Sequence, residues 1–250
     1  MKEVKKLVLS AVMVALAFIL YEFVSIGIPP TTTPFISLSL GIIPIIIIAK
    51  YAGIIYSTIS ATLVDILGYL LVGASKGYAF HPGYTLNAFI SGLVFGLVFY
   101  FSDKLNSKLG KTLIIIIESL VTLVTIPIYL YFFNYYNLEA GYSFEYVSYV
   151  VSLIALIMNT LYVLYSIILS NNDSSNALNL GIIIYQIIVS LLLTPLWVSE
   201  QVQSRVYIYF WTTRLITVPL TGIIYSIITR LLFAPLSATK LARELEMKSI

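Results

Sequence analysis

The sequence predicts an all-α, polytopic helical membrane protein. Hydrophobic residues make up 60% of the 250 residues and charged residues only 10%, and the mean hydropathy is +0.99. Apolar runs of roughly 20 residues are long enough for a helix to cross a hydrocarbon layer about 30 Å thick. Because no soluble domain is evident, residues 1–250 are expected to form a single integral membrane domain.

Apolar runs between polar breaks predict about eight spans. These cover residues 7–25, 36–49, 52–72, 84–101, 112–133, 147–169, 179–198 and 208–233. The first run lacks a small-residue cleavage site after it, so we expect a retained span rather than a signal peptide. The second run is short and contains Pro44, which favours a tilted or partial span.

The basic residues predict the orientation, because Lys and Arg concentrate in cytoplasmic loops. With the N-terminus inside, most of them fall on the inner face: Lys2, Lys5, Lys6, Lys50, Lys104, Lys108, Lys111, Arg230, Lys240, Arg243 and Lys248. Lys76 and Arg205 fall outside, and Arg214 lies within the last span. We therefore expect a multi-pass protein of the cell membrane, surrounded by lipid, with both termini cytoplasmic.

The residue inventory argues against an enzyme. The chain has no cysteine and one histidine, which disfavours thiolate or histidine-rich metal sites. It has no phosphate-binding G-x-x-x-x-G-K-[ST] loop, so ATP hydrolysis would require another chain. No nucleophile and base set is evident. We expect no catalytic residue, metal or cofactor, and no nucleic-acid partner.

Three polar loops are predicted to emerge on the outer face. The first contains Thr31, Thr32 and Thr33 among prolines, the second runs from Lys76 to Tyr84, and the third from Glu200 to Tyr207. Threonine hydroxyls can donate and accept in a binding loop, although a solvated linker would have the same composition. An outward-facing pocket assembled from these loops would suit the capture of a solute.

Two charged residues are predicted within the membrane. Asp65 belongs to a small, polar face of the third span, and Arg214 lies near the outer end of the last span. Intramembrane charges are costly unless paired or hydrated, which favours a functional role. Arg214 could clamp an anionic ligand, or form a structural pair with Asp65 or Glu22.

Two further features each have a functional and a structural interpretation. His81 precedes Pro82 and Gly83, where its side chain could bind a ligand or cap the fourth span. Ala11 and Ala15 form a small-x-x-x-small pair, which lets another helix approach closely, either within this chain or from a partner.

Several stretches resemble the S components of energy-coupling factor (ECF) vitamin transporters, most closely the folate-type family. They are Ser39-Leu-Gly41-Ile-Ile-Pro44, Leu63-Val-Asp65-Ile-Leu-Gly68, the run from Phe80-His-Pro82-Gly83-Tyr84-Thr85-Leu86-Asn87 to Gly96, Thr194-Pro-Leu196-Trp197 and Arg214-Leu-Ile-Thr-Val-Pro219. The resemblance implies a membrane-embedded vitamin-binding subunit without catalytic activity. It also implies docking on a transmembrane coupling subunit driven by two ATPase subunits, with Ala11 and Ala15 matching the docking motif.

The resemblance implies a six-helix core, so residues 112–176 are interpreted as an inserted helical pair. It also implies folate as the vitamin, whose flat pterin stacks on aromatic rings and whose glutamate tail pairs with basic groups. Candidate stacking residues are Tyr21, Phe80, Tyr84, Trp197 and Trp211. Candidate anion partners are Lys76, Arg214 and Arg205. Asn87, Asp65, His81 and the three threonines complete the expected binding set.

Two other functions fit the same observations. One is an S component for a different vitamin or precursor, since a fold does not determine a substrate. The other is a self-sufficient secondary transporter that uses Asp65 or Glu118 for ion coupling.

Overall fold

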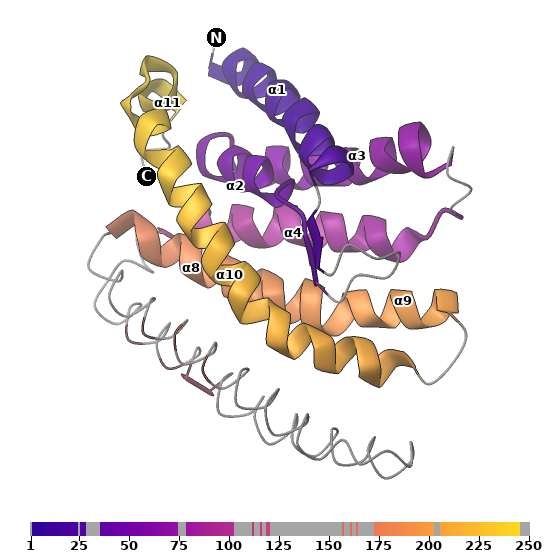
Figure 1. Cartoon of the computed structure of the whole chain (residues 1–250). Coiled ribbons are helices and arrows are strands. Elements are labelled where there is room, and N and C mark those ends of the chain that lie inside the picture. The colour runs from indigo at the N-terminus through magenta and orange to yellow at the C-terminus, as the bar shows by residue number, and fades with distance from the viewer. Residues whose placement is uncertain are drawn as a thin grey trace, which may run out of the picture.

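The computed structural model describes residues 2–24, 26–28, 36–74, 79–102, 173–202 and 206–245, with isolated residues between 112 and 164. The elements are helices and one short strand pair (Figure 1). They are α1 (Lys2–Phe23), β1 (Ile26–Ile28), β2 (Ile36–Leu38), α2 (Ile42–Tyr51), α3 (Ile54–Gly68), the π-helix η1 (Tyr69–Gly73), α4 (Pro82–Tyr100), α8 (Asp173–Tyr185), the π-helix η2 (Gln186–Leu193), α9 (Thr194–Val202), α10 (Val206–Ala238) and α11 (Lys240–Leu245).

The predicted class of helical membrane protein is confirmed. Among the described residues, five helical stretches are long and apolar enough to cross a membrane, and α2 is a shorter apolar helix. The predicted spans 179–198 and 208–233 fall in one continuous run, α8–η2–α9, and in α10. Apart from isolated residues, the predicted spans 112–133 and 147–169 lie outside the described residues, so the inserted pair at 112–176 stays a prediction.

The second predicted span, 36–49, is wrong as a single helix. Residues Ile36–Leu38 form β2, which pairs antiparallel with β1 through Ile26↔Leu38 and Ile28↔Ile36. The helix then runs only from Ile42 to Tyr51, which at 1.5 Å per residue reaches about half of a hydrocarbon layer. Pro44 lies in its first turn, where the missing N–H costs no intrahelical hydrogen bond.

Helix α2 is the centre of the core. Its residues from Ile42 to Ala49 are almost completely buried, and it contacts α1, α3, α4 and α10. A helix that is hydrophobic all round is surrounded either by other elements of the protein or by lipid, and here the surroundings are other helices. The near-continuous isoleucine run therefore reflects burial within the protein, whereas the exposed residues of α1, such as Val4, Leu7 and Val12, form an apolar outer surface.

Close contact between α3 and α4 depends on two glycines of α4. A Cβ on Gly92 would lie 2.7 Å from the Thr58 Cα, and one on Gly96 would lie 2.6 Å from the Ile54 Cα. The Ser57 hydroxyl donates to the Gly92 carbonyl at 2.8 Å. These two glycines thus place the backbones of α3 and α4 against each other, as small residues do in membrane helix pairs.

The two ends of the described chain lie at the same end of the bundle (Figure 1). Helix α11 contacts α1, Leu245 and Ala242 are buried, and Lys5 forms an ion pair with Glu244. The start of the tail therefore docks on the bundle.

Replacing Gly92 with valine should destabilise the protein by about 1–3 kcal/mol, because the new side chain must displace the α3 backbone. Thermal unfolding of detergent-purified protein measures this. Gly73→Ala is the matched control, since its Cβ would meet a movable Tyr69 ring atom at 3.2 Å. Equal melting temperatures for both variants would contradict the close contact.

The contact between α11 and α1 should weaken in acid. Hydrogen bonding and charge attraction from Lys5 hold the pKa of Glu244 below its ordinary value of 4.5. A carboxyl whose folded-state pKa is lowered stabilises the fold above its ordinary pKa, and this contribution is lost as the pH falls through the folded pKa. Hydrogen exchange across 240–245, corrected for intrinsic rates, should accelerate below pH 4.5. Glu244→Gln should remove this acceleration.

Candidate functional site

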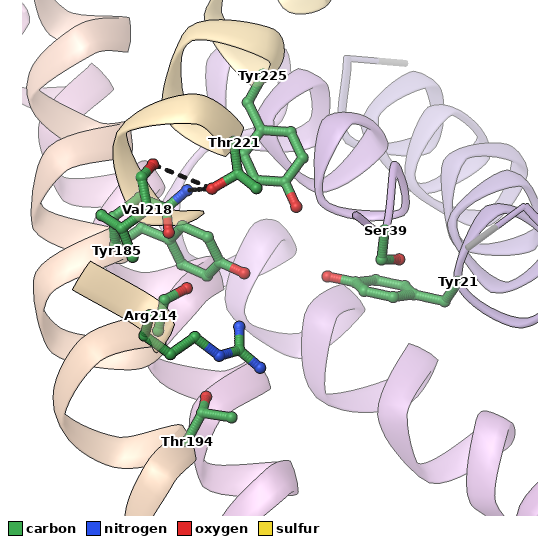
Figure 2. A pocket seen from close by; sticks show the side chains of 10 residues that line it. Tyr21, Ser39, Tyr185, Thr194, Arg214, Val218, Thr221 and Tyr225 are labelled. Atoms are coloured by element: carbon green, nitrogen blue, oxygen red, sulfur yellow. Dashed lines mark hydrogen bonds between the residues drawn. The ribbon is translucent and has the colours of Figure 1, made fainter. Parts of the chain in front are cut away.

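A polar cavity of about 150 Å³ lies between α1, α10 and the α8–η2–α9 run (Figure 2). Most of its lining residues carry a hydroxyl, an amide or a guanidinium group. They are Tyr21, Ser39, Tyr185, Gln186, Ser190, Thr194, Arg214, Val218, Thr221 and Tyr225. A concave site with a few convergent polar groups, enclosed by apolar helices, is the usual form of a small-molecule site.

Three tyrosines and one arginine define the shape of the cavity. Figure 2 shows Arg214 extending between Tyr185 and Thr194, with Tyr21 reaching in from the opposite side. Tyr21 lies against the α2 N-terminus, where a side chain on Gly41 would overlap its ring. The arrangement offers aromatic faces for a flat group and a guanidinium for its oxygen atoms.

A short chain of hydrogen bonds sets the orientation of Gln186. The Thr221 hydroxyl donates to the Val218 carbonyl at 3.0 Å, so its oxygen accepts, and Gln186 Nε2 donates to it at 2.8 Å. Gln186 and Thr221 are both buried. The π-helical segment η2 begins at Gln186, and such segments often occur at functional sites.

A second chain of hydrogen bonds joins α4 to α9 beside the cavity. Trp197 Nε1 donates to Asn87 Oδ1 at 3.0 Å, and Asn87 Nδ2 donates to Thr194 Oγ1 at 3.2 Å. The Thr194 hydroxyl donates to the Val189 carbonyl at 2.7 Å. Of these side chains only Thr194 lines the cavity, so Asn87 and Trp197 lie one layer behind it.

His81 links the N-terminal end of α4 to the C-terminal part of α9. Its Nδ1 accepts from the Gly83 backbone N–H at 3.1 Å, which caps α4. Its Nε2 lies 3.1 Å from the Glu200 carboxylate, and its ring packs against Trp197 with centroids 5.6 Å apart. Of the two interpretations of His81, the geometry matches the cap.

The remaining predicted residues of this region lie around the cavity rather than in it. Phe80 packs edge-on against Tyr69, with centroids 5.0 Å apart, and Tyr84 packs against His81 at 5.5 Å. Asp65 accepts a hydrogen bond from the Thr85 hydroxyl at 2.7 Å. None of these is among the cavity-lining residues.

Several predicted site residues lie outside the described residues, or have side chains that are not described. Thr31, Thr32, Thr33 and Lys76 lie outside the described residues. Trp211 belongs to α10, but its side chain is not among those described. On α1, Ala11 and Ala15 are both exposed, on a helix whose apolar surface is mostly uncovered.

Of the residues that line the cavity, Tyr21 and Arg214 were predicted from the sequence, whereas most of the others were not. The signal was present, because Gln186, Ser190 and Thr194 recur every four residues in an apolar run. Side chains at this spacing share one face of a helix. A polar stripe in a membrane-length helix marks a face turned away from lipid.

The sequence matches a family model and a known transporter. A family model described as "ECF transporter, substrate-specific component" matches residues 5–172. The folate transporter FolT of Clostridium novyi (strain NT) is 32% identical over 130 residues, which cover 52% of this chain and 70% of that protein.

The fold is also similar to that of a solved structure. The crystal structure of FolT bound with folic acid superposes with a TM-score of 0.53 at 19% sequence identity. The match covers 92% of this chain and 93% of that chain. At this identity the likeness speaks for the fold alone.

The predicted resemblance is therefore confirmed: the chain belongs to the family of substrate-specific components of ECF transporters, which are membrane transport subunits and not enzymes.

Proposed function

We propose that this protein captures folate. The observation that carries the proposal is the buried cavity that combines Arg214 with Tyr21, Tyr185 and Tyr225. The name of the Clostridium novyi relative and the folic acid in the similar structure support it. A different vitamin in the same cavity is the alternative.

The size of the cavity suggests how folate enters it. Pockets that hold a whole drug-sized ligand measure roughly 300–1,000 Å³, whereas this cavity measures about 150 Å³, a volume that elsewhere holds a single aromatic ring. The cavity therefore takes up at most one end of folate, and the rest would extend beyond the described lining.

The chemistry of the lining favours the pterin end. A carboxylate only accepts hydrogen bonds, whereas the pterin edge both donates and accepts. The cavity likewise offers donors from Arg214 and acceptors such as Gln186 Oε1 and Thr194 Oγ1. In this arrangement a tyrosine ring stacks on the pterin and the Arg214 guanidinium donates to its carbonyl oxygen.

The partners and orientation complete the proposal. The subunit docks on a transmembrane coupling subunit driven by two ATPase subunits. Ala11 and Ala15 contribute to that contact, because their exposed small side chains permit a close approach of a partner helix. Both termini face the cytoplasm, in line with the basic residues and with the shared end of α1 and α11.

Folate binding should depend on Arg214. Arg214→Ala should weaken folate affinity about thirtyfold or more, since truncating a buried charged partner costs several kcal/mol. Arg214→Lys should recover part of it, because it keeps the charge and loses the planar fork. Titration of purified protein with folate measures both, and mass spectrometry of the co-purified ligand identifies the vitamin. Unchanged affinity in Arg214→Ala would remove Arg214 from the site.

Lys76 provides a separate test of the glutamate tail. If this lysine pairs with a tail carboxylate, Lys76→Ala should weaken folate binding and leave the affinity for free pterin unchanged. Isothermal titration with the two ligands measures the difference. An equal loss for both ligands would contradict a tail contact.

Transport should require the coupling module. Vesicles containing this chain alone should show no folate uptake under an ion gradient, and uptake should appear with the coupling subunit, the ATPases and ATP. Ala11→Leu with Ala15→Leu should abolish that uptake and leave folate affinity unchanged, since leucines prevent a close helix approach. Ile55→Phe, at an exposed apolar position of α3, is the control. Gradient-driven uptake by the chain alone would favour a secondary transporter.

A further inference from the structure

We infer that Thr221 is a positioning residue that determines ligand specificity through Gln186. The structure orients the Gln186 amide so that its oxygen, and not its nitrogen, is available to the cavity. The ligand class selected is a fused-ring heterocycle that presents an N–H or NH₂ donor there. This inference rests on the proposed function and adds the residue that discriminates between related ligands.

The hydrogen bonds of Thr221 determine which atom of the Gln186 amide contacts it. Thr221 donates its single hydroxyl proton to the Val218 carbonyl, one turn earlier in α10. The hydroxyl oxygen can then only accept, so the Gln186 atom that lies 2.8 Å away must be the NH₂ group. Figure 2 shows the two bonds meeting at the Thr221 oxygen. This network of hydrogen bonds assigns the nitrogen and the oxygen of the amide.

The amide oxygen is left to the cavity. Gln186 lines the cavity while only 3% of its surface is exposed, and the described residues offer its Oε1 no hydrogen bond. Once a ligand fills the cavity and excludes water, an acceptor left without a partner is costly, which gives a ligand donor at this place a large advantage. Apolar or oxygen-bearing groups at the same place would leave it unsatisfied or repel it.

A comparison of two ligands makes the inference specific. Folate carries an amino group at position 2 of its pterin, and the analogue with an oxygen at that position carries a carbonyl. The amino group of folate can donate a hydrogen bond to a fixed Gln186 amide oxygen. The carbonyl oxygen of the analogue cannot donate, and its lone pairs would face those of the amide oxygen. A freely turning amide would present its NH₂ group to the carbonyl and bind both ligands similarly.

The test measures the affinities of purified full-length protein for folate and for this 2-oxo analogue. The wild type should prefer folate about tenfold or more, because sites that hydrogen-bond a ligand group reject analogues that cannot form the bond. Thr221→Val keeps the shape, removes the hydroxyl and should reduce the preference to about threefold or less, chiefly by improving binding of the analogue. Thr221→Ser should restore the wild-type preference.

Two further variants serve as a control and as an independent test of Gln186. Ser237→Ala is the control, because Ser237 also donates to the carbonyl three residues earlier but is exposed at the end of the bundle. It should leave both affinities unchanged. Gln186→Met removes the acceptor while keeping the length of the side chain, so it should reduce the preference even if Thr221→Val fails to fold.

The outcomes separate the inference from the proposed function. Folate binding by the wild type without discrimination against the analogue would overturn the inference alone, as would an unchanged preference in Thr221→Val or Gln186→Met. Absence of folate binding by the wild type would overturn both.

Discussion

The constraint on which the rest of the structure depends is that an unpaired polar group inside a membrane-embedded bundle is costly, which favours partners within the protein or on a ligand. Gln186, Asn87 and Thr221 are all buried, and each is part of a hydrogen-bonded chain that ends on a backbone carbonyl. Because the backbone carbonyl can only accept, each chain has a direction. In each chain the carbonyl accepts from a hydroxyl, and the oxygen of that hydroxyl accepts from an amide NH₂ group. In this way the helix backbone determines which way the donors and acceptors beside the cavity point.

Helix α4 connects the packed half of the bundle with the site. On one side, Gly92 and Gly96 bring it against the backbone of α3. On the other side, Asn87 bonds to Thr194 and Trp197, and the bare Cα of Gly83 leaves room for the Trp197 ring. A change in the small residues of α4 would therefore shift α9 and the Thr194 hydroxyl without touching a ligand. Helix α4 is thus one of the elements that link the apolar core around α2 to the polar cavity, together with α1 and α10.

Part of the site could be predicted from single residues. Arg214 stood out because a charge in a membrane span is costly, whereas Tyr21 was predicted as an aromatic ring on which the pterin implied by the family resemblance could stack. His81 was predicted with two roles, and its capping of α4 could be anticipated from the following Pro82 and Gly83. Asn87 and Trp197 were predicted as binding residues, whereas their hydrogen bonds place them behind Thr194. Local sequence does not reveal which of two neighbouring layers faces a cavity.

By itself, the sequence determined the class of the protein, the approximate positions of the described long spans and the residues unlikely to face lipid, because hydropathy and charge act locally along the chain. Only the tertiary structure decided that Ile42–Tyr51 is a buried core helix and that 36–38 is a strand, since both depend on neighbours distant in sequence. It also decided which polar residues of α1, η2, α9 and α10 meet in one cavity and which way the Gln186 amide points. The physical reason is that a hydrogen bond has a direction only once both of its partners are in place.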